Sequence, residues 1–146
     1  MKTLFIATAL LAASFATALS VPPADEPNAH TLTVGFTNLS QRSGALYVGL
    51  INEESATSGG FFRKTRVMVT ATDEPKVTFS NLPAGRYAVQ VFQDLNNNMK
   101  LDYANEMPAE PFGFSNVTSP TGPFSFQQSA VALDAPKNLV ITLTGN

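Results

Sequence analysis

Apolar and polar residues alternate along most of the chain beyond residue 30, with the period of two that is typical of β-strands. Turn-forming Gly, Pro, Asn and Asp residues separate the alternating segments, and none of these segments is a convincing helix. The predicted strands cover residues 32–36, 45–51, 67–69, 77–79, 87–92, 124–133 and 137–144. About seven short strands joined by turns predict an all-β fold, an antiparallel β-sandwich.

The segment 87–92 has the clearest strand pattern in the chain. Alternate residues from 87 to 91 share one face and Phe92 lies on the other, so both faces carry apolar side chains. This pattern predicts a central strand in a sheet that is covered on both sides. Pro83 and Gly85 predict a tight turn just before it, with Gly85 able to take a positive φ. The residues predicted to be in the core are Tyr87, Val89, Val91, Leu139 and Ile141.

The loop after this strand has an oxygen-bearing or carbonyl-presenting residue at every second position. These residues are Asp94, Asn96, Asn98, Lys100 and Asp102. Their spacing is that of an EF-hand loop, which surrounds Ca²⁺ with oxygens and uses the backbone carbonyl of its seventh residue. The sequence therefore predicts a Ca²⁺ site in this loop, with Lys100 contributing its carbonyl oxygen.

The loop also departs from an EF-hand at two positions. Met99 stands where the sharp turn of an EF-hand needs Gly, and Asn105 stands where a bidentate Glu belongs, with Glu106 next to it. Asn residues tolerate the left-handed conformation and bond to their own backbone, so Asn-rich loops also form plain polar turns. A plain polar turn is the alternative to the Ca²⁺ site.

Residues 1–20 have the organisation of a secretory signal peptide. Lys2 provides a short positive region, residues 4–15 are mostly apolar, and small residues follow. The small residues predict cleavage after Ala18 or Ser20. A retained membrane anchor is the alternative, but the apolar run is short and polar residues interrupt it.

Residues 21–30 are predicted to form a flexible Pro-rich leader, and residues 31–146 one β-sandwich domain. We expect an exported protein, periplasmic or secreted, that is not stably inserted in a membrane after signal cleavage. The formal net charge is −2 and no basic cluster occurs, which argues against a nucleic-acid partner. The chain has no Cys and one His, His30 at the edge of the leader, so disulfides, thiolate sites and the usual nucleophilic triads are excluded.

Residues 103–123 contain four Pro and two Gly, show no regular period, and predict one long loop. Loops of this length in compact domains are often functional, so we expect this one to be the interaction surface. The candidate ligand-contacting residues are Glu106, Glu110, Phe112 and Phe114. The two Phe rings and Tyr103 could stack on a sugar or a peptide, or simply anchor the loop in the core.

Two segments of the chain carry a resemblance to known families. Residues 77–89, V-T-F-S-N-L-P-A-G-R-Y-A-V, resemble the strand–turn–strand of prealbumin-like sandwiches, including collagen-adhesin B-type repeats. Residues 94–116 are similar to a bacterial secreted family, domain of unknown function 2141, whose pattern is a D-x-N-x-N-x-K-x-D loop followed by P-x-E-x-[YF]-G-F-S-N. That family usually has Gly at the position of Met99. The resemblance implies a prealbumin-like (Ig-like) sandwich and an exported location, but no reaction.

These observations favour an exported, non-catalytic β-sandwich module that binds an unknown protein or glycan at the cell envelope. Ca²⁺ bound in the loop 94–102 would stabilise it. The alternative is a small extracellular hydrolase that uses Glu106 and Glu110 as a carboxylate pair. Such a pair would need to converge in one concave pocket, so the position of the two side chains bears on the choice.

Overall fold

The computed structural model describes residues 29–145 of the chain. The predicted signal peptide, its cleavage sites and the leader up to residue 28 lie outside this range and stay predictions. No helix within the described range is long and apolar enough to cross a membrane.

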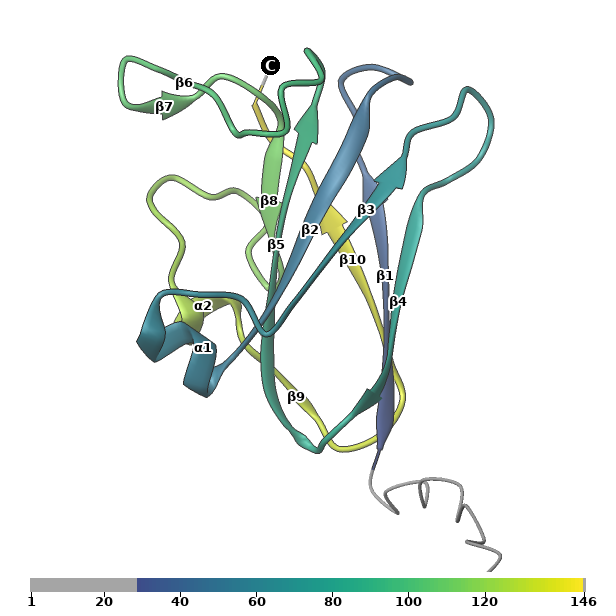
Figure 1. Ribbon diagram of the computed structural model, residues 1–146, viewed down its shortest axis with the longest axis vertical. Coiled ribbons are helices and arrows are strands. Elements are labelled where there is room, and N and C mark those ends of the chain that lie inside the picture. Colours follow the sequence, from purple (N-terminus) through teal and green to yellow (C-terminus); the bar gives the residue numbers. More distant parts are fainter. Residues whose placement is uncertain (1–28, 146) are drawn as a thin grey trace, which may run out of the picture.

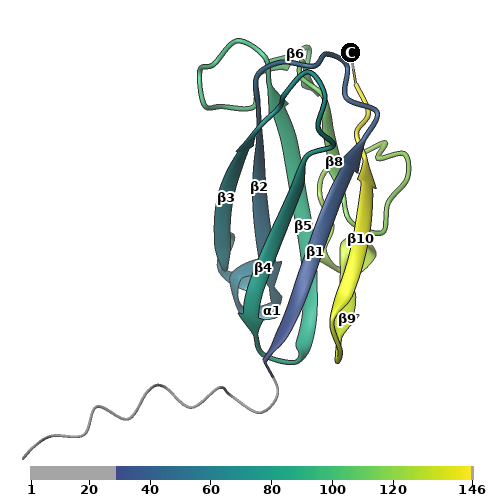
Figure 2. The same cartoon turned by 90° about the vertical axis from the view of Figure 1, so that its right-hand side faces the viewer.

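Two β-sheets pack face to face and give the molecule its sandwich shape (Figures 1 and 2). The smaller sheet has three strands in the order β10 (Lys137–Thr142), β1 (His30–Thr37) and β4 (Lys76–Leu82). Strand β1 is antiparallel to β4 but parallel to β10. The all-β sandwich predicted from the alternation is confirmed, although this one strand pair is parallel.

The larger sheet has five strands and carries the candidate site. Its order is β3 (Arg63–Met68), β2 (Ala45–Asn52), β5 (Gly85–Asp94) and β8 (Phe112–Phe114). Strand β9 (Val131–Leu133) pairs with the beginning of β5, and β8 pairs with its middle. Strand β5 is therefore central, as its apolar pattern predicted.

Short helices and strands occur where the sequence predicted a loop or a continuous strand. Helix α1 (Glu53–Ser58) follows β2, and its Asn52 cap accepts a hydrogen bond from the Ser55 amide at 2.9 Å. Helix α2 (Phe126–Ser129) lies where we expected a continuous strand from 124 to 133. The predicted long loop contains β8 and a small hairpin of β6 (Tyr103–Ala104) and β7 (Met107–Pro108). The expectation that the chain has no helix was wrong, and so was the expectation that residues 103–123 have no regular secondary structure.

The core fills the space between the two sheets. Its fully buried side chains include Val34, Phe36, Leu46, Val48, Leu50, Leu82, Val89, Leu133, Ile141 and Leu143. The predicted core positions Tyr87, Val89, Val91 and Ile141 are buried. Leu139 is only partly buried, although it packs against the core. Burial of aliphatic and aromatic surface from both sheets is the main stabilising contribution.

The turn between β4 and β5 differs in detail from the prediction. Asn81, with a φ of 56°, is the residue in the left-handed region near this turn, and Gly85 is not. Asn adopts this conformation more readily than most residues because its short side chain can bond to the local backbone. The Tyr87 hydroxyl donates to the Pro83 carbonyl at 2.9 Å and holds the turn against the strand.

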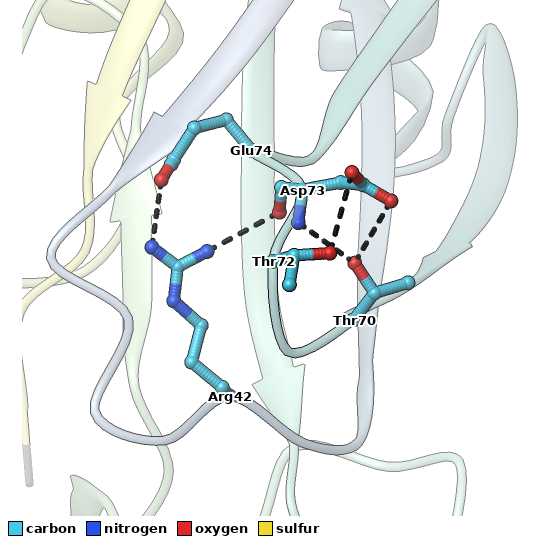
Figure 3. A network of polar contacts seen from close by, with 5 residues as sticks. All are labelled: Arg42, Thr70, Thr72, Asp73 and Glu74. Atoms are coloured by element: carbon cyan, nitrogen blue, oxygen red, sulfur yellow. Dashed lines mark hydrogen bonds and ion pairs between the residues drawn. The ribbon is translucent and has the colours of Figure 1, made fainter.

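Polar contacts join the loops at one end of the sandwich (Figure 3). Arg42, in the loop after β1, donates to Glu74 Oε1 at 2.6 Å and to the Asp73 carbonyl at 3.2 Å, both in the loop before β4. The Thr70 hydroxyl accepts the Asp73 amide at 3.0 Å. The side-chain amide of the buried Gln93, on β5, donates to the carbonyls of Gln41 and Ser43 in the loop between β1 and β2. These contacts fix the loops around the end of β5, where the candidate site begins.

Candidate functional site

The oxygen-rich loop begins at Asp94, the last residue of β5. Asp94 is only 1% exposed, and its two carboxylate oxygens accept hydrogen bonds from the loop's own backbone. Oδ1 accepts the Asn98 amide at 3.2 Å, and Oδ2 accepts the Met99 amide at 2.9 Å. The rigid end of a central strand therefore fixes the path of the loop.

Two residues of the loop adopt the left-handed backbone conformation. Asn97 has a φ of 60° and Met99 a φ of 62°. Met99 stands at the sixth position, where an EF-hand has Gly because the sharp turn needs this conformation. The loop thus makes its sharp turn at Met99 without a Gly.

The alternating side chains of the loop converge on Asp102. The Asn96 amide Nδ2 donates to Asp102 Oδ2 at 2.7 Å, and the Asn98 Nδ2 donates to the same oxygen at 2.7 Å. The Asn98 Oδ1 accepts the amide of Lys100 at 3.0 Å. The structure therefore brings three of the five predicted ligand residues, Asn96, Asn98 and Asp102, into direct contact.

Glu110 closes the loop from the other side, a role that the sequence analysis missed. Its carboxylate is 5% exposed. Oε1 accepts the Leu95 amide at 3.0 Å, and Oε2 accepts the Asp102 amide at 3.4 Å. The Ala109 amide adds a bond to the Asp102 carbonyl at 2.8 Å. Glu110 thus joins both ends of the loop 94–102.

Glu106 has a different environment from Glu110. It is exposed in the turn of the β6–β7 hairpin, where Asn105 and Glu106 have φ values of 50° and 66°. Glu106 lines the groove described below, whereas Glu110 is not among the lining residues.

Within residues 29–145, no group of three or more His, Cys, Asp or Glu side chains is arranged to hold a metal ion. A cation in the loop would depend on amide and carbonyl oxygens besides its aspartates.

A groove of about 1060 Å³ lies over the outer face of the larger sheet. Two rows of cross-strand neighbours form its floor, because residues at paired positions project from the same face of a sheet. The first row contains, from β3 to β8, Arg66, Tyr47, Phe92 and Phe112. The second row contains Lys64, Gly49, Gln90 and Phe114. We call this cavity the aromatic groove.

The rings of the aromatic groove pack on one another. Tyr47 and Phe92 stack with centroids 5.2 Å apart and planes within 9°. Phe114 contacts Phe112 at 5.6 Å and meets Phe124 edge to face at 5.4 Å. Three exposed apolar residues from the loop 94–102 and the β6–β7 hairpin also line the groove: Met99, Tyr103 and Met107. Predominantly apolar concave surfaces of this kind bind ligands.

Two cations mark the β3 edge of the aromatic groove. Arg66 donates to the Tyr47 hydroxyl at 3.3 Å, and this hydrogen bond raises the pKa of the guanidinium from its usual value. The Lys64 ammonium lies 5.6 Å from the centre of the Phe61 ring. That ring occupies the space that a side chain at Gly49 would take, since a Cβ there would lie 2.2 Å from it.

Part of the groove was predictable from the sequence. Phe112, Phe114 and Tyr103 were predicted as a possible platform, and all three line the cavity. Tyr47 and Phe92 were not predicted to belong to it, although each alternates with buried neighbours along its strand. Recognising the groove requires the register that pairs β2 with β5, and the sequence does not supply that register.

Comparison with known proteins gives one match. A family model described as an uncharacterized protein conserved in bacteria (DUF2141) covers residues 34–141. No curated protein and no solved structure matches the chain, so the prealbumin-like core implied by the resemblance stays a prediction. The matched range contains both the polar loop and the aromatic groove. The chain therefore belongs to the bacterial family DUF2141, domain of unknown function 2141.

Proposed function

We propose that this protein is an exported, non-catalytic binding module, periplasmic or secreted, whose ligand occupies the aromatic groove. The observation that carries the proposal is the floor of the groove, where Tyr47, Phe92 and Phe114 project from neighbouring strands of one sheet. Side chains on strands hold a binding surface more rigidly than side chains on loops. Partly exposed aromatic rings would gain contact area and lose hydration on ligand binding.

We further propose that Ca²⁺ binds the loop through Asp94, Asn96, Asn98, the Lys100 carbonyl and Asp102. The left-handed Met99 and the two amide bonds to the Asp94 carboxylate support this assignment, because they give the loop the turn that an EF-hand requires. The ligand atoms would be the side-chain oxygens of the Asp and Asn residues together with the Lys100 carbonyl. With two aspartates in the loop, we expect a weak site.

The loop connects the floor of the aromatic groove to its overhanging hairpin. Phe92 lies two residues before Asp94, and Tyr103 follows Asp102 directly. A bound cation would therefore fix the hairpin relative to the floor, and loss of the cation would loosen one wall of the groove. In this proposal Ca²⁺ has a structural role and takes no part in a reaction.

The hydrolase alternative has less support. A glycosidase-like pair needs one carboxylic acid and one carboxylate on opposite sides of a shared site. Both oxygens of Glu110 accept backbone amides, and Glu110 does not line the groove that Glu106 lines. We further propose that the module acts at the cell envelope, where its macromolecular partner would be a protein or a glycan distinct from the ligand in the aromatic groove. We also propose that the sandwich is related to prealbumin-like domains.

A neutral apolar fluorophore, N-phenyl-1-naphthylamine, tests the binding proposal. The folded mature protein should bind one molecule and enhance its emission. Tyr47→Ala should weaken binding about fivefold or more, since it removes one ring of the stacked pair. The matched control is Val140→Ala on the other sheet, where the side chain is 69% exposed but far from the aromatic groove. Absence of binding to folded protein would contradict the proposal.

A further inference from the structure

We propose that the aromatic groove binds a single-chain anionic amphiphile, a long-chain fatty acid, with its carboxylate at Lys64 and Arg66. The inference rests on the proposed function, because it takes the aromatic groove as the ligand site and names the class of ligand. Its two parts, an anionic head and an apolar chain, are argued separately from the two ends of the groove.

The head is assigned from the charges at the β3 edge. Among residues 29–145 the ion pairs are Arg42–Glu74 and Arg86–Glu53, so neither Lys64 nor Arg66 takes part in one. Lys64 and Arg66 are two residues apart on one strand and share the outer face of the sheet. Their Cα atoms are roughly 6.6 Å apart at the usual rise of a strand, so one carboxylate between them could interact with both.

The opposite side of the groove, at the β6–β7 hairpin, does not favour an anionic head. Glu106 is the one acid among the residues that line the groove, and it belongs to the β6–β7 hairpin. An anionic head is therefore favoured at the β3 edge and disfavoured at the hairpin. A cationic or zwitterionic ligand would not match this distribution of charge.

The chain of the ligand is assigned from the floor and its length. From β3 to β8 the floor crosses three inter-strand spacings, about 14 Å, on the order of the length of an extended twelve-carbon chain. Along that path the rings of Tyr47, Phe92 and Phe112 follow one another in register. Phe114, which contacts Phe112, and Phe124, which contacts Phe114, lie beside the end of this row. An acyl chain placed along the row would contact these rings.

The flexible residues above the floor suit an acyl chain better than a sugar or a peptide. Met99 and Met107 are 68% and 58% exposed, and unbranched Met side chains adapt to irregular apolar ligands. A glycan would need several fixed hydrogen-bond partners, but in the two floor rows the uncharged polar groups are the Tyr47 hydroxyl and the Gln90 amide. A peptide that adds to a sheet needs a free strand edge, whereas this groove lies on a sheet face.

Calorimetric titration of the mature protein with dodecanoate, below its micelle concentration, tests the inference. We expect one molecule to bind, and dodecyltrimethylammonium, which has the same chain and a cationic head, to bind at least tenfold more weakly. The double variant K64Q/R66Q should lose at least tenfold in affinity for dodecanoate, a larger loss than it shows for neutral N-phenyl-1-naphthylamine. The control double variant K76Q/K137Q, with both changes on the smaller sheet, should bind dodecanoate as the wild type does.

The outcomes separate this inference from the proposed function. Binding of the neutral fluorophore without binding of dodecanoate would refute the fatty-acid assignment and leave the binding module standing. Failure of both ligands would refute both proposals. Equal affinity for the anionic and cationic amphiphiles, or equal loss in the K76Q/K137Q control, would mean non-specific detergent-like association and would also overturn the inference.

Discussion

The backbone amide of Met99 donates to Asp94 Oδ2 at 2.9 Å, and this bond holds Met99 in the left-handed conformation with a φ of 62°. A residue with a Cβ adopts that conformation at a cost of about 1–2 kcal/mol. The Met99 side chain is 68% exposed and gains little from packing, so nothing in its contacts offsets this cost. The loop therefore stores strain at the position where an EF-hand loop has Gly.

Met99→Gly is expected to stabilise the protein. Removing the Cβ relieves the strain, while the extra freedom of Gly in the unfolded chain offsets part of the gain, leaving about 0.5–1 kcal/mol. Thermal unfolding should show a rise of a few degrees, about 2–5 °C. Met99→Ala is the matched control, because it truncates the same side chain and keeps the Cβ. If Ala stabilises as much as Gly, backbone strain is not the reason.

Gly113 lies where β8 passes closely over β10. A Cβ at this position would lie 2.8 Å from Ile141 Cγ2 and 3.0 Å from the Thr142 carbonyl oxygen. We expect Gly113→Ala to destabilise the protein by about 1–3 kcal/mol in a denaturant titration, because the buried backbone of β10 cannot move aside freely. Gly122→Ala should be nearly neutral, since nothing lies within 4 Å of its Cβ position. Equal effects would mean that β8 does not pack as described.

Gly113 also illustrates what the sequence could and could not predict about the fold. The period of two predicted the long strands because each one alternates between core and exterior by itself. Strand β8 has three residues, too few for a period. The roles of the G-F-S residues 113–115 depend on contacts with segments that are distant in the sequence. Gly113 leaves room for β10, and the Ser115 hydroxyl accepts the Val89 amide at 2.8 Å and donates to the Ser129 carbonyl at 2.6 Å.

The candidate site likewise has a part that the sequence could predict and a part that it could not. The convergence of Asn96 and Asn98 on Asp102 was predictable because a spacing of two within one short loop brings side chains together locally. The role of Glu110 and the rows of the aromatic groove depend on contacts between distant segments. The parallel pairing of β1 with β10 is equally long-range, and no local pattern specifies it.

Tyr87 should make the stability sensitive to alkaline pH. Burial raises the pKa of its hydroxyl above the usual 10.0. Above pH 10 the unfolded chain therefore loses this proton first, and the free energy of unfolding falls as pH rises toward the pKa of the folded state. Tyr87→Phe should make the stability less dependent on pH in this range. At neutral pH it should cost about 1 kcal/mol, because the bond to the Pro83 carbonyl is lost. An unchanged alkaline slope would show that Tyr87 is not protected by burial.

Val89 tests the central position of β5. Its side chain is fully buried between the sheets, so Val89→Ala should lower the free energy of unfolding by roughly 1–3 kcal/mol in chemical denaturation. Val140→Ala, at a side chain that is 69% exposed on β10, should change it by less than about 0.5 kcal/mol. A loss below about 0.5 kcal/mol for Val89→Ala would mean that its site is not close-packed.

The last prediction concerns Ca²⁺, and the composition of the loop sets its expected size. The loop 94–102 has few acidic residues and Met99 in place of Gly, so we expect a Kd in the weak range of extracellular modules, about 10⁻⁴–10⁻³ M. A ligand that binds only the folded state stabilises it by RT ln(1 + [L]/Kd). At about 10 mM Ca²⁺ and a Kd of about 10⁻⁴ M, this amounts to about 2.7 kcal/mol, a melting shift on the order of 10 °C.

Thermal melts in Ca²⁺ and in chelator measure that shift, and two Asp variants separate binding at the loop from a general salt effect. Asp94→Asn removes a predicted ligand charge at the buried end of β5 and should abolish the Ca²⁺-dependent shift. Asp73→Asn removes an exposed charge in the loop before β4 and should leave the shift intact. Mg²⁺ should stabilise less, because it demands a smaller, near-ideal octahedral site and gives up its water less readily than Ca²⁺. A wild-type shift below about 1 °C, with Asp94→Asn behaving in the same way, would reduce the loop to a polar turn that fixes the hairpin without a metal.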